Sequence, residues 1–163
     1  MKLLQFSKFS VYDIEAMYLS DWEVRLKQGS RKQEGSVIFC PSKSPQCIYI
    51  GWGELQKAKS RFRTHREQAE DSLSRMLKDK KHSRMGVKLL GQMALSVNGH
   101  EAFENHFRAI TGDFRMVLPL FAGGVDHEVR AVFFHCQESD RYFVIVADGP
   151  PEDASELGQV MQH

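Results

Sequence analysis

The sequence predicts an α+β fold in which a mainly antiparallel sheet lies between helical layers. Three observations lead to this class. A long apolar stripe at helical spacing runs from Leu55 to Lys80. Asn98-Gly99 directly follows a run with strand-like alternation. Two runs near the end, residues 128–136 and 141–147, are apolar on both faces, which is typical of central strands covered on both sides.

Length and composition bound the class of protein. With 163 residues, we expect a single globular domain, 1–163, that buries a sizeable core without a metal or disulfide. No apolar run approaches the roughly 20 residues of a membrane span. The first ten residues lack the apolar core of a signal peptide, so we expect a cytoplasmic protein with no membrane association.

Charge is unevenly distributed. Lys57 to Lys88 carries 11 Lys/Arg and 4 Asp/Glu, a balance of +7, so the net +1 leaves −6 on the remainder. The small net charge argues against a uniformly basic nucleic-acid coat. The folded molecule should be strongly dipolar.

The N-terminal third predicts short strands. A turn at Ser20-Asp21 precedes a strand through Trp22, Val24 and Leu26, and two further strands lie in "SVIF" and "QCIYIGWG". We also expect a little helix around residues 13–19.

The long helix is predicted over residues 55–80. Its apolar stripe consists of Leu55, Ala58, Phe62, Ala69, Leu73, Met76 and Leu77. The stripe has one seven-residue gap, and Gly86 is a plausible stop.

The segment after Asn98-Gly99 fits two structures. Both turn residues tolerate positive φ, which predicts a hairpin. Phe103 and Phe107 instead share helical spacing with Ile110. Local signals favour the hairpin, with Asn105 as the misfit on an otherwise apolar face.

The remaining segments complete the predicted layers. "FRMVLPLF" resembles a strand, with Pro119 restricting it to an edge or an end. Since the last two strands are apolar on both faces, a helix must cover each face. Residues 55–80 supply one. The second would follow Pro150-Pro151, with the stripe Ala154, Leu157, Val160 and Met161.

Three motifs resemble a known family. They are "YLSDWEV", "VNGHEAF" and "CQESDRYFVI", in the family's order and over most of the chain. They resemble the PsbP/Mog-like α/β/α sandwich. Leu19-Ser20 departs from it where the family often has proline, and the chain ends at "GQVMQH" without the usual apolar segment. The resemblance implies a strand over residues 101–110. It also implies a module that binds protein partners, since known members include a photosystem subunit and a Ran-binding factor.

The candidates for chemistry are few. The functional interpretation of His100 is a general base. Since no nucleophile is in view near it, we expect instead that its ring packs on a neighbouring strand or caps the turn. The three cysteines Cys40, Cys47 and Cys136 are expected to be reduced thiols. Cys40 and Cys47 are too far apart for a zinc knuckle, and Cys136 and His135 should point to opposite faces of a strand. We therefore predict no metal site and no cofactor.

No catalytic motif is present either. The sequence has no glycine-rich phosphate loop, nucleophile elbow or zinc-protease helix, so we predict no catalytic residue. The alternative is a small-molecule-binding or hydrolytic protein with its site near Gly123-Gly124 and His127.

The basic run "KAKSRFRTHR" is the sharpest functional signal. On one helix, Lys59, Arg63 and Arg66 share a face, which predicts binding to an acidic protein or to phosphates. The simpler interpretation is a solvated face with Arg63–Glu67 and Arg66–Glu70 pairs. We conclude that the chain is a non-enzymatic binding module. An anion or nucleic-acid binder that uses the same basic helix is the other alternative, and we expect weak binding to polyanions.

Overall fold

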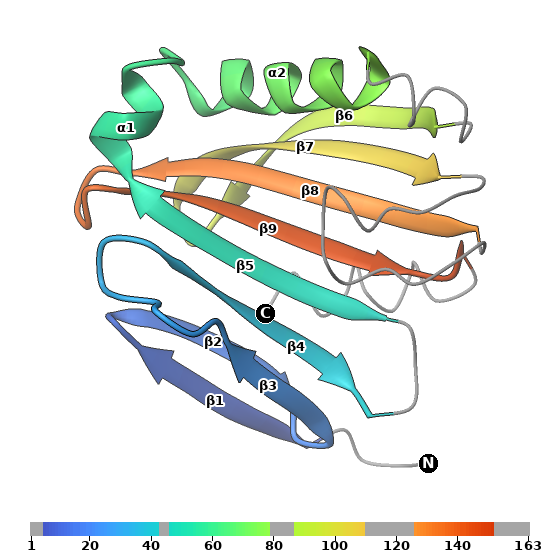
Figure 1. Ribbon diagram of the computed structural model, residues 1–163. Helices are drawn as coiled ribbons and strands as arrows, with labels where there is room; N and C mark the ends of the chain where they lie inside the picture. The colour runs from blue at the N-terminus through green and yellow to red at the C-terminus, as the bar shows by residue number, and fades with distance from the viewer. Residues whose placement is uncertain (1–4, 43–45, 79–86, 110–125, 152–163) are drawn as a thin grey trace.

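The computed structural model describes residues 5–42, 46–78, 87–109 and 126–151. A seven-stranded antiparallel sheet, in the order β3-β4-β5-β9-β8-β7-β6, accompanies a two-stranded sheet formed by β1 and β2 (Figure 1). The elements are β1 (Phe6–Val11), β2 (Ile14–Leu19), β3 (Trp22–Leu26), β4 (Gly35–Pro41), β5 (Cys47–Glu54), α1 (Leu55–Lys59), α2 (His65–Lys78), β6 (Val87–Val97), β7 (His100–Ala109), β8 (His127–Cys136) and β9 (Arg141–Gly149). Neither of these helices is long and apolar enough to cross a membrane.

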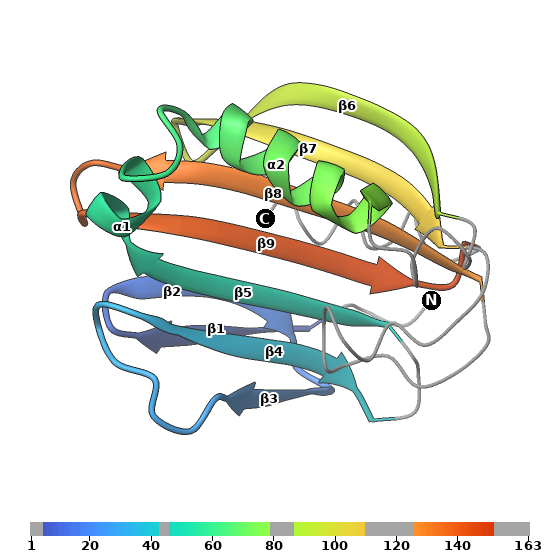
Figure 2. The same cartoon turned by 45° about the horizontal axis from the view of Figure 1, so that its top comes forward.

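Helix α2 covers one face of the large sheet, here called the helix-side face (Figure 2). The helix packs mainly on β7 and β8. Its buried residues Ala69, Leu73 and Met76 form one apolar cluster with the sheet residues Phe103, Phe107, Ala109, Val129, Ala131, Phe133 and Val146. The alternation of β7 thus sends its phenylalanines toward the helix.

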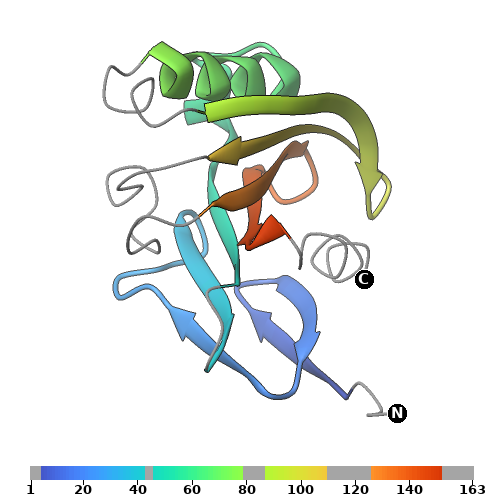
Figure 3. The same cartoon turned by 90° about the vertical axis from the view of Figure 1, so that its right-hand side faces the viewer.

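The opposite face, here called the hairpin-side face, is covered by β1 and β2 (Figure 3). Phe9, Ile14 and Leu19 enter a second cluster with sheet residues that include Phe39, Phe134 and Phe143. The prediction of helical layers on both faces is therefore wrong for the described residues, because the β1–β2 hairpin, and not a helix, covers the hairpin-side face. The proposed C-terminal helix, residues 154–161, lies outside the described residues.

The predicted helix at residues 13–19 is also wrong. Tyr12 and Asp13 have φ of 56° and 60°, which makes a tight turn between β1 and β2. After that turn, burial alternates along β2: Ile14 is buried, Ala16 and Tyr18 are part-buried against the same cluster, and Glu15 and Met17 are exposed. Contacts with the buried cluster on the hairpin-side face therefore stabilise residues 14–19 as a strand and not as a helix.

The single helix over residues 55–80 is wrong, since it is broken into α1 and α2. The Thr64 hydroxyl accepts a hydrogen bond from the backbone N–H of Glu67 at 3.1 Å, and the Glu67 carboxylate accepts one from the N–H of Arg63 at 2.7 Å. The first bond is the N-cap contact of a capping box, and in the second Glu67 reaches back to the residue before the N-cap Thr64, so together they start a new helix. The break coincides with the gap in the apolar stripe.

The hairpin at Asn98-Gly99 is confirmed. Asn98 and Gly99 have φ of 47° and 81°, and Val97 pairs with His100 across the two-residue turn. The chain returns as β7, so the helical alternative for the segment is wrong. Asn105, the predicted misfit, is buried on the helix-side face.

The two C-terminal strands occupy the middle of the sheet, as predicted. β8 and β9 lie between β5 and β7, and both of their faces carry buried residues. The turn between them places Asp140 at a φ of 51°. The strand-like run at 114–121 lies outside the described residues.

The cysteines differ from the expectation of three reduced thiols. Cys40 and Cys47 form a disulfide with a Cα–Cα distance of 4.6 Å, while Cys136 is free and buried. The cause is topological. β4 and β5 pair antiparallel, so their short connection brings the end of one close to the start of the other.

Candidate binding surface at the α1–α2 junction

The break in the helix separates the three predicted binding residues. Lys59 is the last residue of α1, Arg63 lies between the helices, and Arg66 is in the first turn of α2. The shared face of one helix, which motivated their selection, therefore does not exist. Whether they bind a partner stays a prediction.

Each of the three has a different neighbour. Arg66 Nε lies 2.8 Å from Glu70 Oε1, which is a predicted pair, and its guanidinium lies 5.0 Å from the centre of the Phe103 ring. Lys59 Nζ donates to Gln137 Oε1 at 3.0 Å, in the turn between β8 and β9. Glu67 accepts a hydrogen bond from the backbone of Arg63 rather than from its guanidinium.

Three successive cations have no carboxylate partner among the described residues. They are Lys59, Arg61 and Arg63, all exposed, here called the basic cluster. Arg61 lies over the ring of Phe62, at 5.2 Å from its centre. Most other described cations do have a carboxylate partner, namely Lys8, Arg25, Arg31, Lys32, Lys57, Arg66, Arg75, Arg108 and Arg130. The junction is therefore the place where positive charge is concentrated and uncompensated.

Two histidines beside the basic cluster add no charge at neutral pH. The rings of His65 and His135 lie 5.9 Å apart, edge to face. Burial, with the nearby His65 and Lys59, lowers the pKa of His135 to about 4. Burial also lowers the pKa of His65. Nε2 of His135 lies 2.9 Å from Gln68 Oε1, so this side chain joins β8 to α2.

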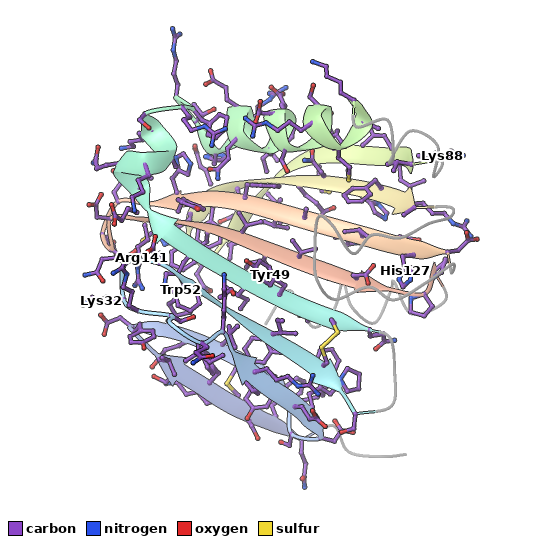
Figure 4. The ribbon with its side chains drawn as sticks, viewed as in Figure 1. Lys32, Tyr49, Trp52, Lys88, His127 and Arg141 are labelled. Carbon is purple, nitrogen blue, oxygen red and sulfur yellow. A yellow bond between two sulfur atoms is a disulfide. The ribbon has the colours of Figure 1, made fainter. Side chains whose placement is uncertain are left out.

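A groove lies on the helix-side face over β5 and β9, which α2 does not cover in the described part of the chain. Its volume is about 300 Å³, and its wall includes Tyr49, Tyr142, Phe133 and Met76. Figure 4 shows Tyr49 on β5. Burial raises the pKa of Tyr142, while nearby Lys57 and Arg61 act in the opposite direction. The basic cluster therefore adjoins the end of an apolar, tyrosine-containing groove.

Glycines make room for the groove's aromatic rings. A Cβ on Gly53 would lie 2.6 Å from a carbon of the Tyr142 ring, and one on Gly51 would lie 2.7 Å from the Tyr49 hydroxyl. A larger residue at either position would displace a tyrosine. The alternation of Gly51 and Gly53 in β5 was the available sequence signal for this site, and sequence analysis missed it.

His100 has a packing role, as expected. Its ring stacks on Phe134, with centres 5.6 Å apart and an interplanar angle of 18°. The ring therefore continues the apolar surface of the hairpin-side face.

The alternative site near His127 is only partly described, because Gly123-Gly124 lies outside the described residues. Nδ1 of His127 lies 3.3 Å from Oδ2 of Asp148, which is 1% exposed. The bond to Asp148 raises the pKa of His127, and burial raises the pKa of Asp148. The pair alone defines no reaction, since a hydrolytic site also needs a nucleophile and an oxyanion-binding group. Within the described part of the chain, no cluster of three His, Cys, Asp or Glu side chains could hold a metal ion.

Arg141 is a buried residue whose role sequence analysis missed. Its Nη1 donates to the carbonyl oxygens of Tyr12 at 2.8 Å and Lys32 at 3.2 Å, and its guanidinium lies 5.5 Å from the centre of the Phe143 ring. Figure 4 shows Arg141 at the same end of the sheet as Lys32 and Trp52. The side chain therefore ties the β1–β2 turn and the β3–β4 loop to β9. Its signal was the arginine within "CQESDRYFVI".

An antiparallel sheet covered by one helix and one hairpin defines the fold class, and solved structures place it as PsbP/Mog-like. CyanoP, the cyanobacterial PsbP of Synechocystis sp. PCC 6803, is 14% identical with a TM-score of 0.64, covering 98% of this chain and 89% of that one. The Ran-binding protein Mog1p of Saccharomyces cerevisiae is 9% identical with a TM-score of 0.55, covering 98% and 86%. No family model and no curated protein matches. The predicted resemblance to the PsbP/Mog-like fold is confirmed.

Proposed function

We propose that this protein is a non-enzymatic binding module whose α1–α2 junction docks on an acidic surface of a partner protein. The observation that carries the proposal is the basic cluster, Lys59, Arg61 and Arg63, for which the described residues supply no carboxylate partner, while most other described cations have one. Arg66 flanks the cluster but is already paired with Glu70, so its contribution should be smaller.

Fold analogy supports the same class of function. Mog1p is a Ran-binding protein, so at least one protein of similar fold acts through a protein partner. Such analogy is a weak argument by itself, because function resides in sites and not in folds. It agrees here with a surface feature observed in this chain, the basic cluster.

A protein partner fits the junction better than a nucleic acid does. A protein offers carboxylates to the cluster and an apolar side chain to the adjoining groove of about 300 Å³. Single-stranded nucleic acid binds on exposed aromatic rings beside a cationic track, whereas Tyr49 and Tyr142 are part-buried in the groove wall. Exposed charge pairs contribute only ~0–1 kcal/mol each, so the cluster would chiefly steer the encounter and set its orientation.

The test compares two variants with equal loss of charge. The cluster variant carries Lys59→Gln, Arg61→Gln and Arg63→Gln. The control variant carries Lys8→Gln, Arg25→Gln and Arg75→Gln, which removes three exposed cations that already have partners. All of these side chains are exposed, so both variants should fold and melt close to wild type.

Wild type and control should recover the same protein from native lysate, and the cluster variant should lose it. Binding should weaken steeply with added salt. An Arg66→Gln variant should show a smaller loss than the cluster variant. Equal recovery by all variants contradicts the proposal. Tight binding of wild type to one defined nucleic acid at physiological salt would assign the cluster to a different partner class.

A further inference from the structure

The two edges of the large sheet differ in how they are protected. β3 has five residues, and its Arg25 and Glu23 side chains pair along it at 2.6 Å. β6 has eleven residues and a single charge, Lys88. Short length and charged side chains are the usual protection against pairing with another chain. β3 has both of these, whereas β6 is long and has Lys88 as its single charge.

β6 is also apolar and exposed. Leu89, Leu90 and Met93 are 41%, 42% and 54% exposed, the last being the highest value among the exposed large apolar residues. Figures 2 and 3 show β6 at the margin of the sheet, with β7 on one side only. The outer N–H and C=O groups of this strand, about 37 Å long at 3.4 Å per residue, have no ladder partner in the described chain.

We propose that β6 pairs antiparallel with β6 of a second copy of this chain, forming a two-fold dimer with one continuous sheet. Antiparallel self-pairing about the middle of the strand brings Lys88 opposite the far half of the partner strand, so the two like charges do not meet. The apolar residues Leu89, Leu90 and Met93 of each copy then meet apolar and uncharged residues of the other.

The protected edge explains why association should stop at two copies. A β6-to-β3 contact would repeat and give an open filament, but the short, charged β3 disfavours it. A β6-to-β6 contact uses the same edge on both copies and closes. The pairing has a preferred stretch as well. A register shift lies between Leu89 and Gly91, so residues 91–97 are the regular part of β6; with pairing about Gln92 they would lie opposite residues 87–93 of the second copy.

Light scattering after size exclusion tests this with the full chain. Wild type should show twice the 18.7 kDa mass of one chain, falling toward one chain on dilution. The double variant Leu90→Lys, Met93→Lys should show the mass of one chain at every concentration, which is a twofold loss where wild type is dimeric. Met17→Lys is the control, since Met17 is 42% exposed, as Leu90 is, but lies in β2, and this variant should remain dimeric. A monomeric wild type, or a double variant that stays dimeric, overturns the proposal.

Amide hydrogen exchange on wild type provides a test independent of the variants' folding. Protection of residues 91–97 should rise with protein concentration, while protection of β3 should not change. Unchanged protection of β6 would also overturn the proposal, as would protection that appears only when a different protein is added. The basic cluster lies outside β6, so this result is separate from that of the partner-binding experiment.

Discussion

The side chain of Asn105 donates a hydrogen bond from Nδ2 to the carbonyl oxygen of Ala69 at 2.8 Å, which joins β7 to the middle of α2. Its Oδ1 accepts another from Gln92 Nε2 at 2.8 Å, on the edge strand β6. Asn105 is 2% exposed, so water does not replace these bonds. One amide thus connects three elements at the boundary between the helix and the sheet.

Asn105→Ala should therefore lower the free energy of unfolding by about 1–3 kcal/mol, the cost of unmaking buried hydrogen bonds. Urea denaturation measures the change. Gln92→Ala is the control, because it removes only one of the two hydrogen bonds of Asn105 and Gln92 itself is exposed; its cost should be about 1 kcal/mol or less. Equal costs for both variants would contradict a structural role centred on Asn105.

The turn at Gly99 yields a second prediction. Gly99 has a φ of 81°, and a Cβ there would meet no atom within 4 Å, so any penalty arises from the backbone and not from a clash. Gly99→Val should cost about 1–3 kcal/mol, the scale of such strain. Ser96→Val, three residues earlier in β6 and also exposed, should cost almost nothing because β-branched residues suit strands. Comparable losses from the two substitutions would show that the turn conformation is not what matters.

The sequence predicted best where local chemistry alone decides the structure. Asn98-Gly99 fixes a turn whatever lies around it, and two-sided apolar runs fit only the centre of a covered sheet. The break between α1 and α2 could also have been predicted, since Thr64 and Glu67 have capping-box spacing. The apolar stripe, which continues on both sides of the break, favoured one long helix instead. The layer on the hairpin-side face was not readable. Phe9, Ile14 and Leu19 become core residues only through contacts with distant strands.

The candidate site was predictable only in part, for the same reason. Charge counting located the basic region, but it could not separate Arg66, paired with Glu70, from Arg61 and Arg63, which have no carboxylate partner in the described chain. Which carboxylate an arginine contacts depends on where the side chains lie, and the break between α1 and α2 changes those positions. The groove beside the cluster depends on Tyr49 and Tyr142, which come from strands far apart in the sequence.

The disulfide gives a third prediction. Cys40 and Cys47 are seven residues apart. Closing a loop of that size lowers the entropy of the unfolded chain, which raises the free energy of unfolding by about 2–3 kcal/mol. A reductant should lower the stability of wild type by that amount in urea denaturation. The double variant Cys40→Ala, Cys47→Ala should be insensitive to the reductant. Cys136→Ala should retain full sensitivity, since that thiol is free. Wild-type stability that does not respond to the reductant would mean that the bond is absent or without effect.

Metal content is a fourth prediction. The disulfide occupies two of the three cysteines, and purified protein should carry no stoichiometric zinc by elemental analysis. A chelator should leave the melting temperature unchanged. Reproducible one-to-one zinc would contradict this, and would point to ligands that include residues beyond those described.

The pKa of His135 makes stability depend on pH in a defined direction. In the folded protein it is about 4, lowered by burial and by nearby His65 and Lys59, against an ordinary value of 6.5. Between these two values the unfolded chain binds a proton that the folded chain does not. The contribution of neutral His135 to stability is therefore fully present above about pH 6.5 and is lost as the pH falls toward 4. Since the ring is only partly buried, solvent screening reduces the effect to on the order of 1 kcal/mol.

His135→Gln isolates this effect, because glutamine does not titrate but can still donate a hydrogen bond to Gln68. The free energy of unfolding of wild type should fall more steeply than that of the variant between pH 6.5 and pH 4.5, with parallel behaviour above pH 6.5. An NMR titration of the His135 ring should show a midpoint near 4. His65→Gln removes one of the neighbouring charges and should move that midpoint upward. A midpoint at the ordinary value of 6.5 would mean that water reaches the ring freely, and that the His135–Gln68 contact between β8 and α2 opens in solution.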